Sequence, residues 1–258
     1  MSWDALHGQL ENELGEPVTL DAVTGGWRLA QRARGHRHSV DDVLTARYAL
    51  DQVQAAPPSV ALDLGSGIGG VGLLVLWGLP ARSRLICVEA QAVSHRLLTA
   101  NIAGNQLGDR VEVRLGDLRQ LALPAPVALI TGSPPYFPIG SGILPTDAQK
   151  AHARFELRGD VGDYATCAAR HLTDDGVFVC CFPTAQQARA LARIAASGLH
   201  VTAMRQVIPR AGLRPLFSLF ACRPAPDRCH EDPPFVVRDA SGEITPEMRE
   251  VRRGFGFE

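Results

Sequence analysis

From about residue 60 onward, mostly apolar runs alternate with amphipathic stretches, an order that is typical of a doubly wound α/β fold. The apolar runs predict buried parallel strands near residues 60–64, 84–88, 111–115, 127–131 and 176–182. The amphipathic stretches predict helices near residues 69–78, 91–105, 118–122, 160–172 and 184–197. Two further runs, 200–209 and 216–222, predict strands that pair antiparallel. We therefore expect a mainly parallel seven-stranded sheet whose last strand is antiparallel.

Shorter elements flank this core on both sides. Residues 3–15 have the pattern of an amphipathic helix, and residues 17–29 predict two short strands joined by a Gly-Gly turn. The Pro-rich stretch 224–234 predicts a connector, and residues 235–243 predict a strand and turn before a short charged helix. We therefore divide the chain into an N-terminal extension, a core and a C-terminal extension, at 1–50, 51–223 and 224–258.

The first predicted core strand runs into a glycine-rich turn. Gly65, Gly67 and Gly70 satisfy the G-x-G-x-x-G of dinucleotide sites, whereas Asp63, Gly65, Gly67 and Gly69 satisfy the D-x-G-x-G-x-G of S-adenosylmethionine sites. A dinucleotide presents a pyrophosphate to such a turn, so a carboxylate beside it is unfavourable. S-adenosylmethionine instead carries an ammonium and a sulfonium. Asp63 therefore favours S-adenosylmethionine, with a turn that binds no ligand as the alternative.

Two further carboxylates follow the next strands of the predicted sheet. Glu89 closes the second strand, 26 positions after Asp63 in the sequence (89 − 63). Acids at about this separation meet the ribose hydroxyls in βαβ nucleotide sites. Asp117 follows the third strand, where it is placed with Leu118 to meet the adenine, its carboxylate accepting from the amino group. Either acid alone could simply cap a helix. Together with the glycine turn they predict a cofactor site.

The fourth strand leads directly into Ser133, Pro134, Pro135, Tyr136 and Phe137. Proline at 134 biases Ser133 toward an extended conformation, and consecutive prolines offer carbonyls without amide donors. The Ser133 hydroxyl and the Pro134 carbonyl can hold the hydrogens of an exocyclic amine in the geometry needed for attack on a methyl group. Tyr136 is expected to stack on a flipped base. The alternative is a purely structural turn with a core aromatic.

The densest positive cluster of the chain contains Arg32, Arg34 and Arg37 and precedes Ser39, a plausible helix N-cap. It is either a solvated loop or a lip that contacts RNA phosphates. The net charge of −1 creates no overall field for an anionic partner, so such a partner must meet a local cluster of this kind.

Composition sets the remaining limits. With 258 residues, of which 46% are hydrophobic, the chain can bury a full α/β core. The N-terminus lacks the basic and apolar segments of a signal peptide, and no apolar run is long enough to span a bilayer, so we expect a cytoplasmic protein. The six cysteines form no C-x-x-C pair. We expect buried free thiols and no metal site.

With these motifs in place, the chain resembles class I S-adenosylmethionine-dependent methyltransferases of the amino-methylating branch, and in particular the bacterial tRNA(Val) adenine-N6 methyltransferases. The resemblance rests on the segments 39–44, 63–69, 133–137 and 239–247. It implies a Rossmann-like fold, S-adenosylmethionine as cofactor, and methyl transfer to N6 of an adenine in the tRNA anticodon loop. It also implies that Asp41 lies beside the cofactor and that Phe137, with the arginine cluster, lies on the RNA side.

One departure from that family keeps other functions open. Ser133 stands where the family has asparagine, and S-P-P-Y is also the form found in cytosine-N4 methyltransferases. Related N-P-P-Y enzymes methylate a glutamine amide of a protein. A protein that binds S-adenosylmethionine and RNA without catalysis is a fourth possibility.

Overall fold

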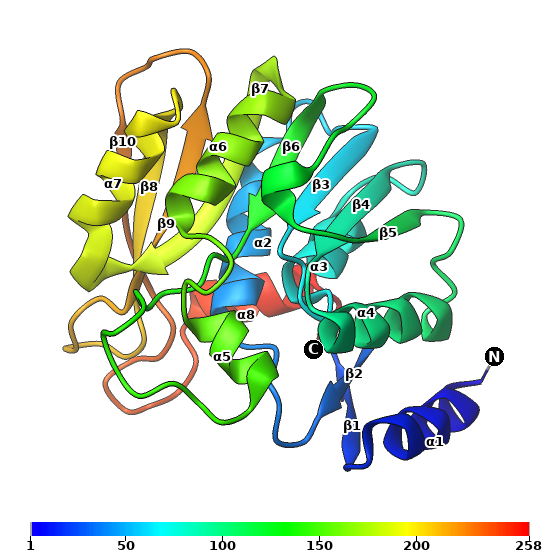
Figure 1. Cartoon of the computed structure of the whole chain (residues 1–258). Helices are drawn as coiled ribbons and strands as arrows, with labels where there is room; N and C mark the ends of the chain where they lie inside the picture. Colours follow the sequence, from blue (N-terminus) through cyan, green and yellow to red (C-terminus); the bar gives the residue numbers. More distant parts are fainter. Residues whose placement is uncertain (1, 258) are drawn as a thin grey trace.

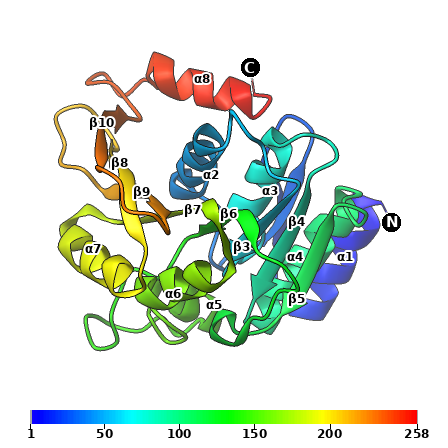
Figure 2. The same cartoon turned by 90° about the horizontal axis from the view of Figure 1, so that it is seen from above.

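The computed structural model describes residues 2–257, whose centre is an eight-stranded sheet with helices on both faces (Figures 1 and 2). The strands are β3 (Val60–Leu64), β4 (Arg84–Glu89), β5 (Val111–Leu115), β6 (Val127–Gly132), β7 (Leu172–Pro183), β8 (His200–Ile208), β9 (Phe217–Arg223) and β10 (His230–Val236). Their order is β10-β8-β9-β7-β6-β3-β4-β5. Only β9 runs antiparallel to its neighbours, β7 and β8. The predicted mainly parallel sheet is therefore confirmed.

The eighth strand is a difference from the seven strands expected. The stretch predicted to be a connector enters β10, which pairs with β8 at the edge of the sheet. Pro233 and Pro234 lie within β10, where the register shifts between Asp232 and Phe235. Prolines fit an edge strand because one side of it needs no amide donors. The Pro-rich composition therefore concealed a strand.

Alternate side chains of the strands pack into two separate hydrophobic cores, one on each face of the sheet. Ala61 of β3 faces the core built with α2 (Val40–Gln52), α3 (Gly70–Gly78) and α4 (Ala92–Gly104). Leu62 and Leu64 face the core built with α6 (Val161–His171) and α7 (Gln187–Ala196). This burial on both faces explains why the strands are mostly apolar runs.

Two short helical elements differ from the prediction. Residues expected to form a helix near 118–122 form only the single 3-10 turn η1 (Leu118–Gln120). A helix that was not predicted, α5 (Ala148–Arg154), lies in the connection between β6 and α6. A further 3-10 turn, η2 (Thr184–Gln186), precedes α7.

The N-terminal residues form α1 (Trp3–Leu14) and a separate antiparallel pair, β1 (Val18–Ala22) and β2 (Arg28–Arg32). Asn101 of α4 fixes this pair to the core, because its side chain accepts a hydrogen bond from the amide of Ala30 at 2.7 Å. The last helix, α8 (Pro246–Gly254), begins at the N-cap Thr245 and packs against β10. The proposed boundary at residue 50 falls inside α2.

The order in which the strands are added to the sheet switches sides between β3 and β6. From β3 the strands proceed outward to β4 and β5, whereas β6 lies on the other side of β3 and continues to β7. Ligands of open α/β sheets bind outside the carboxyl ends of the strands at such a switch point. Within residues 2–257 no helix has the length and apolar character needed to cross a membrane.

Candidate active site

A pocket at the carboxyl ends of β3, β4, β5 and β6 gathers most of the residues singled out in the sequence. Of the predicted cofactor, catalytic and RNA residues, those that line it are Asp41, Asp63, Gly65, Gly67, Glu89, Asp117, Leu118, Ser133, Pro134, Pro135, Tyr136, Arg37 and Phe137. Gly69, Arg32 and Arg34 do not line it. The structure thus brings the glycine turn and the Ser-Pro-Pro-Tyr turn to one cavity.

The three glycines of the turn have different roles. Gly65 and Gly67 have φ of 59° and 56°, a left-handed conformation that favours glycine. A Cβ on Gly65 would lie 2.0 Å from the Tyr164 hydroxyl, whereas a Cβ on Gly67 would meet nothing within 4 Å. Gly69 is the N-cap of α3, and a Cβ there would press on Leu98 and Leu73. Gly69 therefore shapes the turn from the core side, and Gly67 leaves room for a ligand.

Asp63 is a buried carboxylate with one unused oxygen. Only 1% of the residue is exposed, and Thr131 Oγ1 donates to Asp63 Oδ1 at 2.7 Å. Oδ2 has no hydrogen-bond partner among the described residues. Burial raises the pKa of Asp63 to about 7. Oδ2 is buried against Gly72 of α3, so the carboxyl of Asp63 would act on a cationic ligand through its charge in the pocket wall and not through a hydrogen bond from this oxygen.

The titration of the Asp63 carboxyl should be visible in the pH dependence of the free energy of unfolding. Because burial raises its pKa from 3.8 in the unfolded chain to about 7, the folded state holds an extra proton between these values. Stability should therefore fall as pH rises through this window, by at most about 4 kcal/mol. Asp63→Asn should flatten that fall. Thermal unfolding without cofactor at about pH 5 and pH 8 tests this, and parallel profiles for the two proteins would contradict it.

Glu89 connects the end of β4 to the glycine turn. Its Oε2 accepts from the amide of Gly67 at 2.8 Å, and its Oε1 accepts from the amide of Gln91 at 2.6 Å. Burial raises the pKa of this carboxyl, while the backbone donors oppose that shift. Each carboxylate oxygen can accept a second hydrogen bond. Glu89 can therefore hold the turn in place and still accept from a ligand.

The carboxylate of Asp117 already accepts hydrogen bonds within the protein, which the sequence did not suggest. Its side chain caps η1 by accepting from the amide of Arg119 at 2.9 Å, and Arg119 Nη2 donates to its Oδ2 at 2.6 Å. These hydrogen bonds from Arg119 lower the pKa of Asp117. The capping role that was the alternative for this acid is therefore present in the structure. The adjacent Leu118 is buried and lines the pocket.

The Ser-Pro-Pro-Tyr turn is held by contacts from α2 and β7. The Tyr136 hydroxyl donates to Asp41 Oδ2 at 2.8 Å and lies 3.2 Å from Cys181 Sγ. Ser133 Oγ lies 3.5 Å from the same sulfur. Burial raises the pKa of Cys181 to about 12, so this cysteine is a neutral thiol. Asp41 thus contacts the Ser-Pro-Pro-Tyr turn directly, and its predicted contact with the cofactor stays a prediction.

Cys181 was predicted only as a buried core residue. It is indeed buried in the structure, yet its sulfur contacts both polar side chains of the turn. Nothing in the sequence distinguishes it from Cys180, because both lie in the same apolar strand. Other pocket residues that sequence reasoning missed come from the loop before α2, from α2, α5 and α6, and from the segment between α5 and α6. They include His36, His38, Asp42, Gln149, His152, Arg154, Arg158 and Tyr164.

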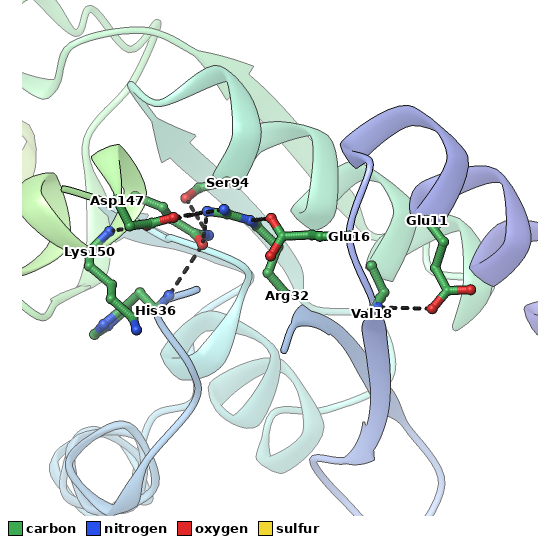
Figure 3. Close-up of polar contacts among 9 residues, drawn as sticks. Glu11, Glu16, Val18, Arg32, His36, Ser94, Asp147 and Lys150 are labelled. Atoms are coloured by element: carbon green, nitrogen blue, oxygen red, sulfur yellow. Dashed lines mark hydrogen bonds and ion pairs between the residues drawn. The ribbon is translucent and has the colours of Figure 1, made fainter. Parts of the chain in front are cut away.

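The three clustered arginines have separate surroundings. The guanidinium of Arg32 pairs with Glu16 and, at 2.7 Å, with Asp147 (Figure 3). Arg37 pairs with Asp21 at 2.9 Å and also lines the pocket. Arg34 is exposed and its side chain makes no hydrogen bond within residues 2–257. Arg32 therefore has ion-pair partners inside the protein, and its contact with an RNA phosphate stays a prediction.

Comparison with known proteins supports the reading of the motifs. No family model matches the chain. Curated proteins named tRNA1(Val) (adenine(37)-N6)-methyltransferase do match it. The one from Phocaeicola vulgatus is 29% identical over 168 residues, which cover 65% of this chain and 70% of that protein. The one from Aeromonas hydrophila is 32% identical over 151 residues, which cover 58% of this chain and 63% of that protein.

Solved structures show the same fold at low sequence identity. A predicted O-methyltransferase from Agrobacterium tumefaciens superposes with a TM-score of 0.63 and 17% identity, over 85% of this chain and 98% of that one. Trm5b from Pyrococcus abyssi superposes with a TM-score of 0.53 and 16% identity, over 80% of this chain and 55% of that one. The relatives' names support the expected cofactor, S-adenosylmethionine. The predicted resemblance is confirmed: the chain has the class I methyltransferase fold and is homologous to curated tRNA(Val) adenine-N6 methyltransferases.

Proposed function

We propose that the protein transfers a methyl group from S-adenosylmethionine to N6 of an adenine in tRNA. The observation that carries this proposal is the single pocket lined by both the glycine turn after β3 and the Ser-Pro-Pro-Tyr turn after β6. These two strands are neighbours in the sheet, so their carboxyl ends are close in space. The glycine turn suits a cationic nucleoside cofactor, and the Ser-Pro-Pro-Tyr turn suits an exocyclic amine.

The residues around the glycine turn fit the cofactor. When bound, S-adenosylmethionine supplies a methyl group already activated by its sulfonium. Asp63 would place a negative charge in the pocket wall near the positive groups of the cofactor, and Glu89 would accept from the ribose hydroxyls. Gly67 leaves the approach to the backbone open. Asp117 would contribute through an oxygen shared with Arg119.

The Ser-Pro-Pro-Tyr turn would orient the nucleophile. The Pro134 carbonyl accepts no hydrogen bond from residues 2–257, so it is free to accept from an amine together with Ser133 Oγ. Holding both amine hydrogens favours the non-planar geometry in which the nitrogen lone pair can attack. Tyr136, fixed through its hydroxyl by Asp41, would stack on the base. Positioning dominates this chemistry, and the methylated amine can lose its proton afterwards.

Contacts to the RNA backbone are assigned to Arg34 and Arg37 on the N-terminal side of the pocket. Arg34 has no partner in the described part of the chain, and Arg37 lines the pocket although it pairs with Asp21. Phosphate contacts of this kind position a nucleic acid without reading its sequence. The exposed ring of Phe137 at the pocket is assigned to a base next to the target.

Transfer of labelled methyl from S-adenosylmethionine to separate tRNA, rRNA, DNA and protein fractions, followed by analysis of the modified nucleosides, tests the proposal. We expect N6-methyladenosine in tRNA. Because serine replaces asparagine in the turn, N4-methylcytidine is the second candidate product, and finding it alone would reassign the target base. Methylated glutamine in protein would reassign the substrate class. Cofactor binding with no labelled product in any fraction would contradict a catalytic role.

A further inference from the structure

We propose that a second surface beside the pocket binds the RNA strand that enters it. This surface, which we call the α5 rim, consists of Lys150 and Arg154 on α5 and the exposed apolar side chains of the loop 137–146. The two cations would contact phosphates, and the loop would contact bases beside the target. The inference rests on the proposed function, since it identifies how the same pocket receives its substrate.

The charges of the α5 rim have no partner within the protein. Lys150 and Arg154 are four residues apart on α5 and therefore project from the same side of the helix. Neither side chain forms an ion pair or hydrogen bond with any residue of the described chain, 2–257. Arg154 lines the pocket.

The position of α5 is fixed by a partly buried network of polar contacts, shown in Figure 3. Asp147 is the N-cap of α5, accepting from the amide of Lys150 at 2.9 Å, and it also pairs with Arg32. Gln149 is 2% exposed, accepts from the amide of His36 at 3.2 Å and donates to Ser94 Oγ at 3.1 Å. These contacts fix the helix against the N-terminal loop and α4. Arg32 thus has a positioning role, because it holds in place a helix that carries free cations.

The loop 137–146 supplies the apolar half of the α5 rim. Its side chains Phe137, Ile139, Ile143 and Leu144 are 43%, 66%, 96% and 45% exposed. Backbone hydrogen bonds attach its start to the end of α5, because the carbonyl of Arg154 accepts from the amides of Tyr136 and Phe137 at 3.0 and 2.9 Å. The apolar loop and the cations therefore border the catalytic turn together.

This combination matches single-stranded RNA better than a protein partner. Proteins that hold single strands join cations that follow the backbone with apolar or aromatic side chains that contact the bases. Unpaired cations complement phosphates, and the base to be methylated must leave its stack to reach the pocket. The α5 rim offers both kinds of contact within one short segment, next to the turn that would receive the base.

The charge of the rim is tested by the double variant Lys150→Gln/Arg154→Gln. The concentration of tRNA that half-saturates the protein should rise about tenfold or more. The slope of log affinity against log salt should become shallower by about 1–2, since each phosphate contact contributes roughly 0.7–0.9. The affinity for S-adenosylmethionine should stay unchanged. An unchanged salt slope would overturn the proposal.

A matched control removes two positive charges from the other end of the parallel strands, away from the pocket. Arg82 and Arg228 are exposed and lie just before β4 and β10, at the amino ends of the parallel strands. Arg82→Gln/Arg228→Gln should leave tRNA binding and its salt slope unchanged. The variant Ile143→Ser/Leu144→Ser should weaken tRNA binding without changing the slope. Equal effects of the control and the rim variant would mean that only total charge matters and would overturn the assignment to α5.

Lys150 also allows a direct footprint, because it is the only lysine of the chain. Acetylation with an amine-reactive ester, followed by peptide mass spectrometry, measures its accessibility alone. Unmodified tRNA should slow acetylation of Lys150 at low salt and should not do so at high salt. Equal rates with and without tRNA would overturn the α5 rim. If Lys150 is protected but no RNA is ever methylated, the rim stands and the proposed function fails; methylation without protection gives the reverse result.

Discussion

Replacing Glu89 by alanine is expected to reduce the affinity of the protein for S-adenosylmethionine by roughly 100-fold or more. The carboxylate would lose its hydrogen bonds to the ribose hydroxyls, and a hydrogen bond to a charged group contributes about 1.5–3 kcal/mol. The substitution also leaves the amides of Gly67 and Gln91 without their acceptor, so the glycine turn loses its fixed geometry. Isothermal calorimetry with S-adenosylmethionine measures the effect.

Two controls separate loss of a ligand contact from loss of the fold. Glu89→Gln keeps one acceptor of similar shape and should lose less affinity than the alanine variant. Glu112→Ala removes a glutamate from β5 whose side chain is 55% exposed and whose one ion pair within residues 2–257 is with Arg114, and it should leave cofactor binding unchanged. Thermal unfolding of all three shows whether they remain folded. A folded Glu89→Ala protein with wild-type affinity would exclude Glu89 from the cofactor site.

The core strands could be predicted from the sequence because they are buried on both faces. β3 begins and ends where its apolar run predicted, at Val60 and Leu64. The placement of the residues at the ends of the strands was also predictable. Once the parallel strands are placed, their carboxyl ends must lie at the same end of the sheet. Asp63 and Glu89 lie in the last two residues of β3 and β4, Ser133 directly follows β6, and the structure brings all three to the pocket.

What the sequence could not predict depends on contacts between distant segments. Arg32 belongs to a positive cluster in the sequence, yet its partner Asp147 lies 115 positions away. Gln149 is a neutral residue in a short helix without a clear apolar stripe, and only the folded chain shows that it connects α5 to Ser94. β10 was hidden because its prolines are typical of connectors and are tolerated only at a sheet edge.

The second large effect should come from Tyr136. Tyr136→Ala is expected to lower kcat by roughly 100-fold while leaving the affinity for S-adenosylmethionine unchanged, because the target base loses a stacking contact worth about 1–3 kcal/mol and the fixed orientation that this contact provides. Tyr136→Phe keeps the ring but removes the hydrogen bond to Asp41, so it should lose less activity. Single-turnover rates with saturating cofactor measure both, and full activity of the alanine variant would make this turn merely structural.

The contact between Ser133 and Cys181 sharpens the test of the target base. Ser133 Oγ is 3.5 Å from Cys181 Sγ, and Cys181 is fully buried, so the longer side chain of Ser133→Asn would press on a sulfur that cannot move outward. Overpacking of this kind costs about 1–3 kcal/mol. We expect Ser133→Asn alone to lose about tenfold or more in activity, and Ser133→Asn/Cys181→Ala to recover much of it if adenine is the target. Cys181→Ala alone is the control, since it makes space without changing the residue that holds the amine. If the serine protein methylates cytosine and the double variant loses that activity, the serine belongs to a cytosine-N4 enzyme. If Ser133→Asn alone is fully active, Cys181 does not limit the residue at this position.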